Sequence, residues 1–557
     1  MPALPAFSFL LERRKPSVLL SMVLFGTLLL VPMELQAVDW STLFTAQDVR
    51  DHLATEKGRA EALEFCRKMG ISKVYIEAFR DGYQAEAQTL ETARDFFRQA
   101  GLRVSGCVTT TGIGKPSSGW NVAVCYTNRK NQERLESIFR FAAGIFDEIM
   151  IDDFFFTDCQ CSECAAAKGS MSWQQYREKL MLEMARDRVL GPAKQVNPKV
   201  KVILKYPQWY DSFQDRGYVV DRETELFDRI WVGTELRDPS SDEWGHKQQY
   251  TGYFLYRWLS DIGGEKTGGG WFDPFGTDTT IYLDQALVTI LAGAPEVFLF
   301  HYGSLISSQY KEQAEALAAR RKEFEGLSKL VGGWAGIPAY KPVSSGPSDE
   351  RFEFDQIGML AIPLAPTAHF PDKARAALFT LHSLEDAEFV AKLASFLNSG
   401  ATALVSEGLA HALNGDPRLP STAPLNLPKD KYLLKVQEGN GNLVVFSDSL
   451  PRLTYVDSSN RIAQWSAAQR EALAELRKIV EEFTVTSTDA PPRVAVFPLG
   501  ARVAVVNFTE LPVACKVAGL GGMVSRLRKA FATSGASLAS DGVTLRLPPH
   551  AIIVVEQ

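Results

Sequence analysis

The 557-residue sequence lacks the motifs of several large protein classes. It has no Gly-x-Ser-x-Gly nucleophile elbow and no His-Glu-x-x-His helix, which argues against an α/β-hydrolase esterase and a zinc protease. The glycine-rich stretches at 112–115 and 268–270 do not have the spacing of a phosphate-binding loop. No long basic run follows residue 40 and the formal net charge is −6, so no nucleic-acid partner is expected.

Cysteine is also scarce. There are seven, an odd number scattered over a long chain, which excludes a disulfide-stabilised scaffold. They are Cys66, Cys107, Cys125, Cys159, Cys161, Cys164 and Cys515. Four of them could serve a metal ion, and the others would then be buried singly.

The first 37 residues have the pattern of a secretory signal. Three basic residues at 13–15 precede an apolar run over 18–33, and Ala37 offers a small residue at a cleavage point. A permanent membrane anchor is the alternative, but the run is short for a span of about 20 residues. No cysteine follows it, so a lipoprotein is not indicated. We expect a cleaved signal peptide, a secreted or periplasmic protein and no stable membrane insertion.

The remaining chain predicts several folded domains. Its length favours about three, and 46% hydrophobic with 23% charged residues is typical of globular proteins. From 38 to 335, strand and helix patterns alternate. Strands are predicted at 40–45, 73–78, 103–109, 148–151, 201–206, 229–233, 268–272 and 296–300, and helices at 59–69, 90–100, 131–145, 173–195, 221–227, 279–292 and 309–330. Eight such units predict a TIM (β/α)8 barrel.

Two smaller domains are expected after the barrel. A linker at 338–347 precedes a small α/β unit over 348–414, with a helix at 387–397. A proline-rich linker at 416–428 follows. Residues 430–557 contain six short apolar runs, from 432 onward, and one helix at 467–483. This pattern predicts a C-terminal β-sandwich.

Acidic residues end four of the predicted barrel strands. Glu77 ends the second, Asp152 and Asp153 the fourth, Glu235 the sixth and Asp273 the seventh. In a barrel these ends meet at one mouth, where chemistry is placed. Glycoside hydrolysis needs two carboxyl groups, and crowding raises the pKa of at least one of them. The alternative is that these acids cap helices. Strand register decides which of the adjacent aspartates faces the axis.

Aromatic side chains occur in the same loops. They are Tyr83, Trp120, Trp209, Tyr210, Trp244, Trp271 and Tyr302. Sugars pack their C–H faces on such rings, so the pattern favours a carbohydrate cleft, although core packing is the alternative. Lys205 and His301 also end strands and could bind a sugar hydroxyl, or could be satisfied structural residues.

A cysteine cluster follows the fourth strand. Cys159, Cys161 and Cys164 can supply three thiolates, and tetrahedral zinc needs a fourth ligand. Cys125, in the neighbouring loop, is the best candidate, and Cys107 inside a strand is less suitable. Four sulfur ligands leave no open position, so the zinc would be structural. Unmetallated thiols or one disulfide are the alternatives.

With this cluster the chain resembles family 42 glycoside hydrolases, the bacterial β-galactosidases. The resemblance extends to the domain order, in which a barrel is followed by an amidotransferase-like domain used for trimerisation and a β domain. The stretch 379–408 is similar to that middle domain. The resemblance implies a structural zinc site and a homotrimer.

The chain departs from that family at the catalytic positions. Asp153 and Phe154 stand where the family has Asn-Glu after strand four, and Asp273 is the nearest acid to the Glu after strand seven. An aspartate at strand four with an acid at strand six is more similar to the α-galactosidase clan. On that analogy Asp152 or Asp153 would be the nucleophile and Glu235 the acid/base.

The sequence therefore predicts a secreted glycoside hydrolase that acts on an oligo- or polysaccharide. Asp152 or Asp153, with Glu235, is the expected catalytic pair, supported by Asp273, and Glu77 and the aromatic residues would bind substrate. The rival is a non-catalytic carbohydrate-binding or assembly protein on a degenerate barrel, favoured by Phe154 at a catalytic position. A lyase or transglycosylase is a third reading.

Overall fold

The computed structural model describes residues 37–242, 245–420, 423–457, 464–487, 489–519 and 527–556. The predicted signal segment, apart from Ala37, and Trp244 lie outside the described residues. Among the helices of the described residues, none is both long and apolar enough to cross a membrane. Residues 37–557 form one compact unit.

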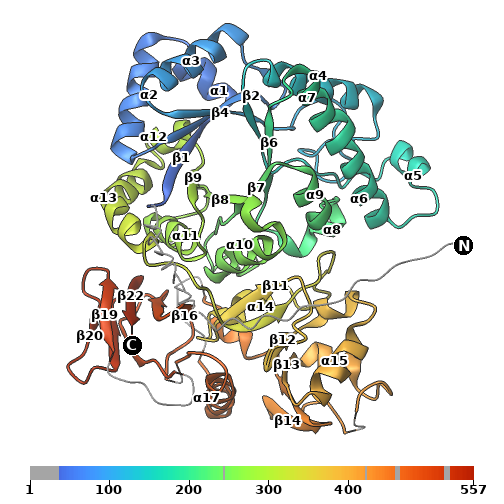
Figure 1. Cartoon of the computed structure of the whole chain (residues 1–557), viewed down its shortest axis with the longest axis vertical. Coiled ribbons are helices and arrows are strands. Elements are labelled where there is room, and N and C mark those ends of the chain that lie inside the picture. Colours follow the sequence, from blue (N-terminus) through green and yellow to red (C-terminus); the bar gives the residue numbers. More distant parts are fainter. Residues whose placement is uncertain are drawn as a thin grey trace, which may run out of the picture. The chain divides into compact units, whose positions relative to one another are not determined.

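The predicted barrel is confirmed (Figure 1). Its parallel strands are β1 (Asp39–Phe44), β2 (Lys73–Arg80), β4 (Arg103–Val108), β5 (Glu148–Ile151), β6 (Lys201–Tyr206), β7 (Arg229–Gly233), β8 (Thr267–Phe272) and β9 (Glu296–Leu299). Pairing of β1 with both β9 and β2 closes the ring, and a short strand β3 (Tyr83–Gln84) adds to β2 in antiparallel fashion. Closure leaves no open sheet edge between the eight strands.

One apolar side chain from each barrel strand fills the interior. These are Leu43, Tyr75, Cys107, Met150, Ile203, Trp231, Trp271 and Phe298. Trp231 lies against the backbone of β8, where a Cβ on Gly268 or Gly269 would approach its ring within 2.5 Å. The glycine-rich stretch therefore makes room for an indole in the barrel.

Helices surround the barrel, most of them where the sequence pattern predicted. They are α2 (Glu56–Met69), α3 (Ala87–Gln99), α4 (Arg129–Ala143), α6 (Trp173–Met184), α9 (Val220–Leu226), α10 (Tyr250–Gly263), α11 (Thr279–Leu291) and α13 (Lys311–Ser328). The long helix predicted at 173–195 is instead α6, a π-helical segment at Ala185–Leu190 and α7 (Gly191–Val196). Helix α10 was not predicted. This helix lies between the barrel and the residues that follow it. Trp258 donates a hydrogen bond to the Lys341 carbonyl, and Tyr250 accepts one from the Leu364 backbone.

The second domain is a six-stranded mixed sheet. Its order is β11 (Leu364–Thr367), β10 (Ile337–Tyr340), β12 (Ala376–Phe379), β13 (Thr402–Ser406), β15 (Gly441–Phe446) and β14 (Leu433–Glu438). Helices α14 (Glu353–Gly358), α15 (Phe389–Asn398) and α16 (Glu407–Leu413) accompany it. Two features differ from the sequence prediction. Strand β10 lies in the expected linker, and β14 and β15, expected in the β domain, complete this sheet through parallel pairing of β15 with β13.

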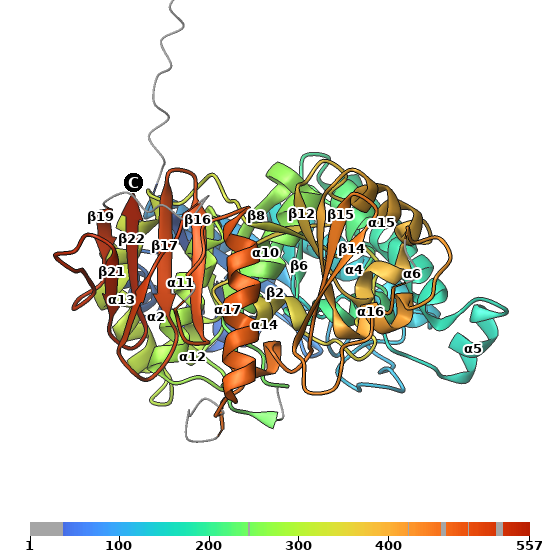
Figure 2. The same ribbon diagram turned by 90° about the horizontal axis from the view of Figure 1, so that it is seen from below.

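The C-terminal domain follows helix α17 (Ala467–Glu481). It has a sheet of β16 (Val494–Leu499), β17 (Arg502–Asn507), β22 (Ala551–Glu556) and β19 (Arg528–Ala532), and another of β18 (Val513–Lys516), β21 (Thr544–Leu547) and β20 (Ser537–Leu538). All pairings are antiparallel. Val505 and Ile553 from the first sheet share a core with Cys515 and Leu545 from the second, as the sandwich prediction required. Figure 2 shows the strands of the first sheet, β16, β17, β22 and β19, side by side.

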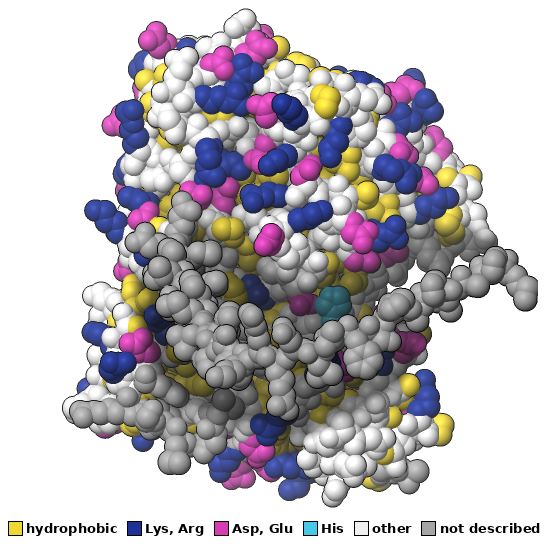
Figure 3. Space-filling view, in the orientation of Figure 1, with side chains coloured by type: hydrophobic (Ala, Val, Ile, Leu, Met, Phe, Trp, Pro, Cys, Tyr) yellow, Lys and Arg dark blue, Asp and Glu magenta, His cyan; other side chains and the backbone are white. Residues whose placement is uncertain are grey.

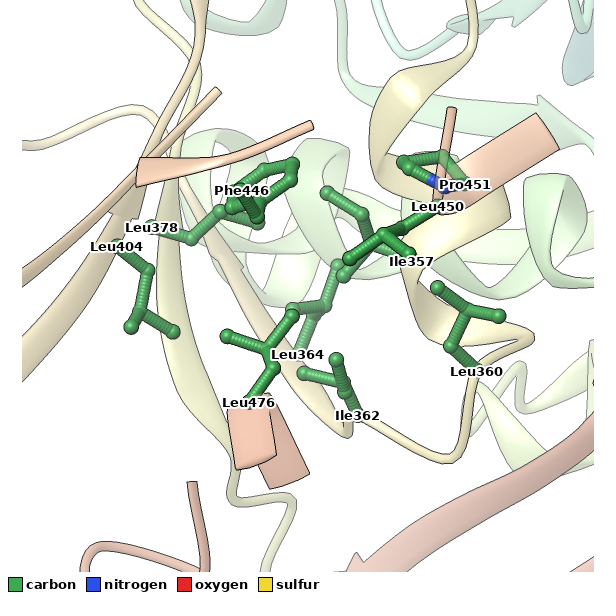
Figure 4. A pocket seen from close by; sticks show the side chains of 10 residues that line it. All are labelled: Ile357, Leu360, Ile362, Leu364, Leu378, Leu404, Phe446, Leu450, Pro451 and Leu476. Atoms are coloured by element: carbon green, nitrogen blue, oxygen red, sulfur yellow. The ribbon is translucent and has the colours of Figure 1, made fainter. Parts of the chain in front are cut away.

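An apolar cavity of about 10 Å³ lies in the second domain (Figure 4). Its lining includes Leu364 and Leu404 from the sheet, Ile357 from α14, Leu476 from α17, and Leu450, which precedes a short 3-10 helix at Pro451–Thr454. That volume is close to the minimum for one water molecule, and the lining offers no polar partner. We therefore regard it as a packing defect and not as a ligand site.

Charged side chains are mixed on the face shown in Figure 3. Basic and acidic groups alternate over the barrel there, outside the residues that the structure does not describe. This face therefore carries no single-sign patch of the kind that attracts nucleic acid.

Candidate active site at the barrel mouth

Strand alternation brings a polar layer to the mouth, directly above the apolar interior. Five residues of the apolar interior are each followed, two positions later, by a polar residue. The interior residues are Tyr75, Cys107, Met150, Ile203 and Trp271, and the polar residues are, in the same order, Glu77, Thr109, Asp152, Lys205 and Asp273. Because side chains alternate along a strand, these groups continue on the inner face. The structure thus places the predicted acids from β2, β5 and β8 with Lys205 on one mouth.

Asp152 is fixed by cations. Its carboxylate pairs with the Lys205 ammonium, lies 2.5 Å from an Arg80 nitrogen, and accepts a hydrogen bond of 3.0 Å from Thr109. Only 1% of its side chain is exposed. Burial alone would raise the pKa of Asp152, but the charges of Lys205 and Arg80 outweigh it and lower the pKa below its usual value. Asp152 is therefore an ionised group with both oxygens engaged.

Asp153 lies just beyond the strand and is more accessible. Its side chain is 16% exposed and its carboxylate is 3.9 Å from the Lys205 nitrogen. Burial raises the pKa of Asp153 well above its usual value, the charges of Asp152 and Glu235 raise it further, and Lys205 opposes them. Adjacent aspartates therefore have opposite protonation tendencies, which is how proteins separate acid and base roles.

Glu235 and Asp273 share one arginine. Arg237 donates to Glu235 at 3.1 Å and contacts both oxygens of Asp273 at 2.9 and 3.0 Å. All three side chains are largely buried. Burial and the neighbouring Glu235 carboxylate raise the pKa of Asp273 well above its usual value, against the charge of Arg237. Burial and the Glu235 charge therefore favour the protonated form of Asp273.

Glu77 belongs to the same layer and is fully buried. It accepts hydrogen bonds from the Ala46 backbone at 2.9 Å, Arg80 at 2.7 Å and Thr109 at 2.5 Å. Burial raises its pKa, and Arg80 opposes that rise. Arg80 thus bridges Glu77 and Asp152.

The predicted aromatic residues fall into different surroundings. Trp120 is 43% exposed and lies 5.7 Å from the Phe154 ring, and Trp209 lies 5.1 Å from Phe156. Trp271 is buried with the Lys205 nitrogen 3.7 Å from its ring centre. These rings surround the mouth or form its floor.

Three other predicted residues are held in separate contacts. Tyr210 is buried and donates to Asp355 of the second domain at 3.0 Å, and Tyr302 packs on Phe44 at 4.8 Å. His301 contacts Asp48 at 2.8 Å through Nδ1. Although burial favours protonation of Asp48, the His301 contact lowers its pKa. The contacts of Tyr210 and Tyr302 point to structural packing.

The four predicted cysteines meet. Their sulfur atoms lie within 4.8 Å of one another, and Cys125 is 3.6 Å from Cys164 and 3.8 Å from Cys161, which is 3.7 Å from Cys164. A tetrahedral ion with bonds of about 2.3 Å to sulfur places its ligands roughly 3.8 Å apart. A disulfide needs about 2.05 Å, and all seven cysteines are free thiols. The cluster therefore fits a metal ion and not a disulfide.

Two arginines of the site were not predicted. Arg80 is three residues after Glu77, and Arg237 is two residues after Glu235. Each pairs with the acid before it and reaches a second acid on another strand. A cation close to a strand-end acid is the signal that could have found them.

Comparisons with known proteins agree with this fold. A GH42 β-galactosidase, Gan42B from G. stearothermophilus, matches with a TM-score of 0.60 and 11% identity over 94% of this chain and 98% of that chain. α-L-Fucosidase isoenzyme 2 from Paenibacillus thiaminolyticus matches with a TM-score of 0.58 and 12% identity over 94% and 100%. At these identities the likeness shows the three-part fold alone.

Sequence comparison adds two matches. An uncharacterized protein of Saccharolobus solfataricus is 26% identical over 447 residues, which is 74% of this chain and 70% of that protein. The model of the family described as "Probable glycosyl hydrolase, catalytic domain" matches residues 30–329. That range spans the barrel with its carboxylates and exceeds half of the chain, and so the chain belongs to this family of probable glycosyl hydrolases.

Proposed function

We propose that this chain hydrolyses a glycosidic bond of an oligo- or polysaccharide with paired carboxyl groups at the barrel mouth. The observation that carries the proposal is Asp153. Its side chain is partly exposed. Burial and the negative charges of Asp152 and of Glu235, which comes from another strand, raise its pKa. Two carboxyl groups that interact, one of them inclined to hold a proton, are what hydrolysis requires.

Asp153 would act as general acid. Burial and the charges of Asp152 and Glu235 favour its protonated form, and it would give this proton to the oxygen of the departing sugar as the glycosidic bond breaks. Glu235 would supply the opposing carboxylate, either attacking the anomeric carbon or removing a proton from the attacking water. This assignment exchanges the roles that the α-galactosidase analogy implied for the two strands.

Asp152, Lys205 and Arg80 would form a fixed charge arrangement around the acid. Asp152 has both oxygens engaged and 1% exposure, which leaves it poorly placed to touch a sugar. Its negative charge raises the pKa of Asp153, whereas Lys205 limits that rise. Arg237 would hold Glu235 and Asp273 in register in the same way.

The cysteine cluster would hold a structural zinc ion. The four sulfurs can occupy all positions of a tetrahedron, which leaves none for substrate or water. Cys125 comes from the loop after β4 and the others from the loop after β5, so the ion would join two loops of the mouth. Two further parts of the proposal are predictions from the sequence. The first 37 residues would direct secretion, and the chain would form a homotrimer.

A hydrolysis panel tests the function. The parent would be incubated with α- and β-glycosides and with neutral oligo- and polysaccharides, beside Glu235→Gln and the control Glu225→Gln, an exposed acid on α9. We expect sugar release by the parent and the control, and its loss in Glu235→Gln. Release that survives Glu235→Gln would overturn the role of Glu235. Products with an unsaturated sugar end would indicate a lyase, and binding without turnover would favour the carbohydrate-binding alternative.

A further inference from the structure

A polar cleft of about 400 Å³ opens beside the mouth. It is lined by the connections that follow β4, β5 and β6, together with Arg177 of helix α6. Its side chains are mostly polar and include Ser118, Asp158, Gln160, Ser212, Asp215 and Arg216. None of these residues belongs to the carboxylate layer described above, so the cleft is separate from the predicted catalytic groups.

Arg216, which lines the cleft, packs against three aromatic rings. The Arg216 guanidinium carbon lies 4.8 Å from the Trp209 ring centre, 5.1 Å from Phe156 and 5.8 Å from Trp120. Trp120 and Phe156 are stacked, with centroids 5.8 Å apart, and 43% of Trp120 remains exposed. An exposed, held indole next to polar groups is a platform on which the C–H face of a sugar can pack.

The same rings connect the cleft to the catalytic layer. Phe154 follows Asp153 in the chain, and its ring is 5.7 Å from Trp120. Tyr218 donates to the Asp153 carbonyl at 2.9 Å and packs on Trp209 at 5.6 Å. A chain of sugars with one bond at Asp153 could therefore extend along this aromatic wall toward the cleft.

The cleft is held open by its own hydrogen bonds. The Asp158 carboxylate accepts from the Ser117 hydroxyl at 2.5 Å and from the Trp120 backbone at 2.9 Å. Arg177 donates to the backbone carbonyls of Asp158 and Asp215 at 2.9 and 2.6 Å. The loops that carry the lining groups are thus fixed to one another, and such preorganisation lowers the cost of binding.

The charges of the cleft favour a neutral ligand. Arg177 and Arg216 offset Asp158 and Asp215, and Arg216 lies 4.0 Å from Asp158, too far for a hydrogen bond. Sugar hydroxyls both donate and accept, so neighbouring carboxylate and guanidinium groups can bind a pair of them. With two carboxylates and two guanidinium groups in its lining, the cleft has no net charge that would attract an ionic sugar.

We propose that this cleft is a subsite for a neutral sugar unit of an oligosaccharide, remote from the bond that is cleaved. The inference rests on the proposed glycosidase function for its place in catalysis. It makes chain length a determinant of specificity, with longer chains preferred over disaccharides.

Binding and turnover would be measured as a function of chain length. The probes are gluco-, manno-, galacto- and xylo-oligosaccharides of increasing length. Saturation-transfer NMR gives binding and product analysis gives kcat/KM. Arg216→Ala removes the guanidinium, and Asp215→Asn and Gln160→Ala are milder changes at exposed positions. Arg222→Ala, an exposed arginine on α9 outside the cleft, is the matched control.

The parent is expected to bind and cleave longer chains of one series better than the disaccharide. Loss of a charge-assisted hydrogen bond should reduce that preference about tenfold in Arg216→Ala, mainly through KM, and less in the milder variants. Arg222→Ala should keep the full preference. Length-dependent binding that Arg216→Ala weakens would support the subsite even without turnover, in which case only the glycosidase proposal fails. Turnover or binding independent of length, or unchanged in all three cleft variants, would overturn the subsite, as would no binding of any series.

Discussion

Asp152 and Asp153 can be replaced one at a time to show which of them acts on the substrate and which only holds neighbouring groups in place. Asp152→Asn leaves Lys205 and Arg80 facing a neutral amide. Removing one partner of a buried ion pair costs roughly 3–5 kcal/mol because the remaining charge is uncompensated. With an unfolding entropy of about 2.1 cal/mol/K per residue, a barrel of roughly 300 residues shifts by about 1.6 °C per kcal/mol, so its melting temperature should fall by about 5–8 °C. Differential scanning calorimetry at neutral pH measures it.

The same substitution should shift the pH profile without abolishing activity. The negative charge of Asp152 raises the pKa of Asp153, so its removal lowers that pKa. The activity of a general acid is lost as pH rises through its pKa, and the alkaline limb of kcat/KM should therefore move to lower pH.

Asp153→Asn should show the opposite pattern. The pKa of Asp153 is raised in the folded protein, so ionisation of this carboxyl destabilises the fold. The stability that its neutral form confers therefore declines as the pH rises above the pKa of the unfolded chain. The amide should therefore cost no stability, while activity falls about 10²- to 10⁴-fold. A folded Asp152→Asn without activity beside an active Asp153→Asn would refute the reasoning.

Three further predictions concern the rest of the chain. The parent should contain about one zinc per chain by mass spectrometry, and Cys161→Ser should lose it whereas Cys515→Ser, in the β domain, should keep it; equal zinc in all three would contradict the site. The pKa of His550 is raised to about 9, because Asp284 and Glu510 outweigh its burial. Its stabilisation, at most about 3 kcal/mol, should be complete below pH 6.5 and lost as pH rises through about 9, and urea unfolding of His550→Gln should lack this component of the pH dependence. Leu450→Ala should enlarge the apolar cavity and cost about 2–5 kcal/mol in urea unfolding; an unchanged midpoint would mean that the cavity is not closed.

Sequence patterns located the barrel because each strand is a short apolar run between helices. The same reasoning missed α10, since most of this helix is buried against the barrel and the second domain and its exposed polar residues lie near its C-terminal end. It also assigned β14 and β15 to the wrong sheet. They form a hairpin, and local pattern cannot tell that β15 pairs with β13, about 40 residues earlier.

The candidate site was predictable only in part. The spacing of the cysteines predicted the four residues whose sulfur atoms lie close together. The ends of the predicted strands identified the acids that lie at the barrel mouth. The different states of Asp152 and Asp153 depend on Lys205 and Arg80, which reach them from other strands. Such long-range pairing sets a pKa and leaves no mark on the local sequence.

The central claim is that Asp153 protonates the leaving group. It is tested most directly by kcat/KM of Asp153→Asn on dinitrophenyl and alkyl glycosides of the sugar that the panel identifies. A dinitrophenolate departs without a proton, so we expect near-parental bond cleavage of the dinitrophenyl glycoside and a loss of about 10²- to 10⁴-fold for the alkyl glycoside. Equal losses on both substrates, or no loss on either, would contradict it.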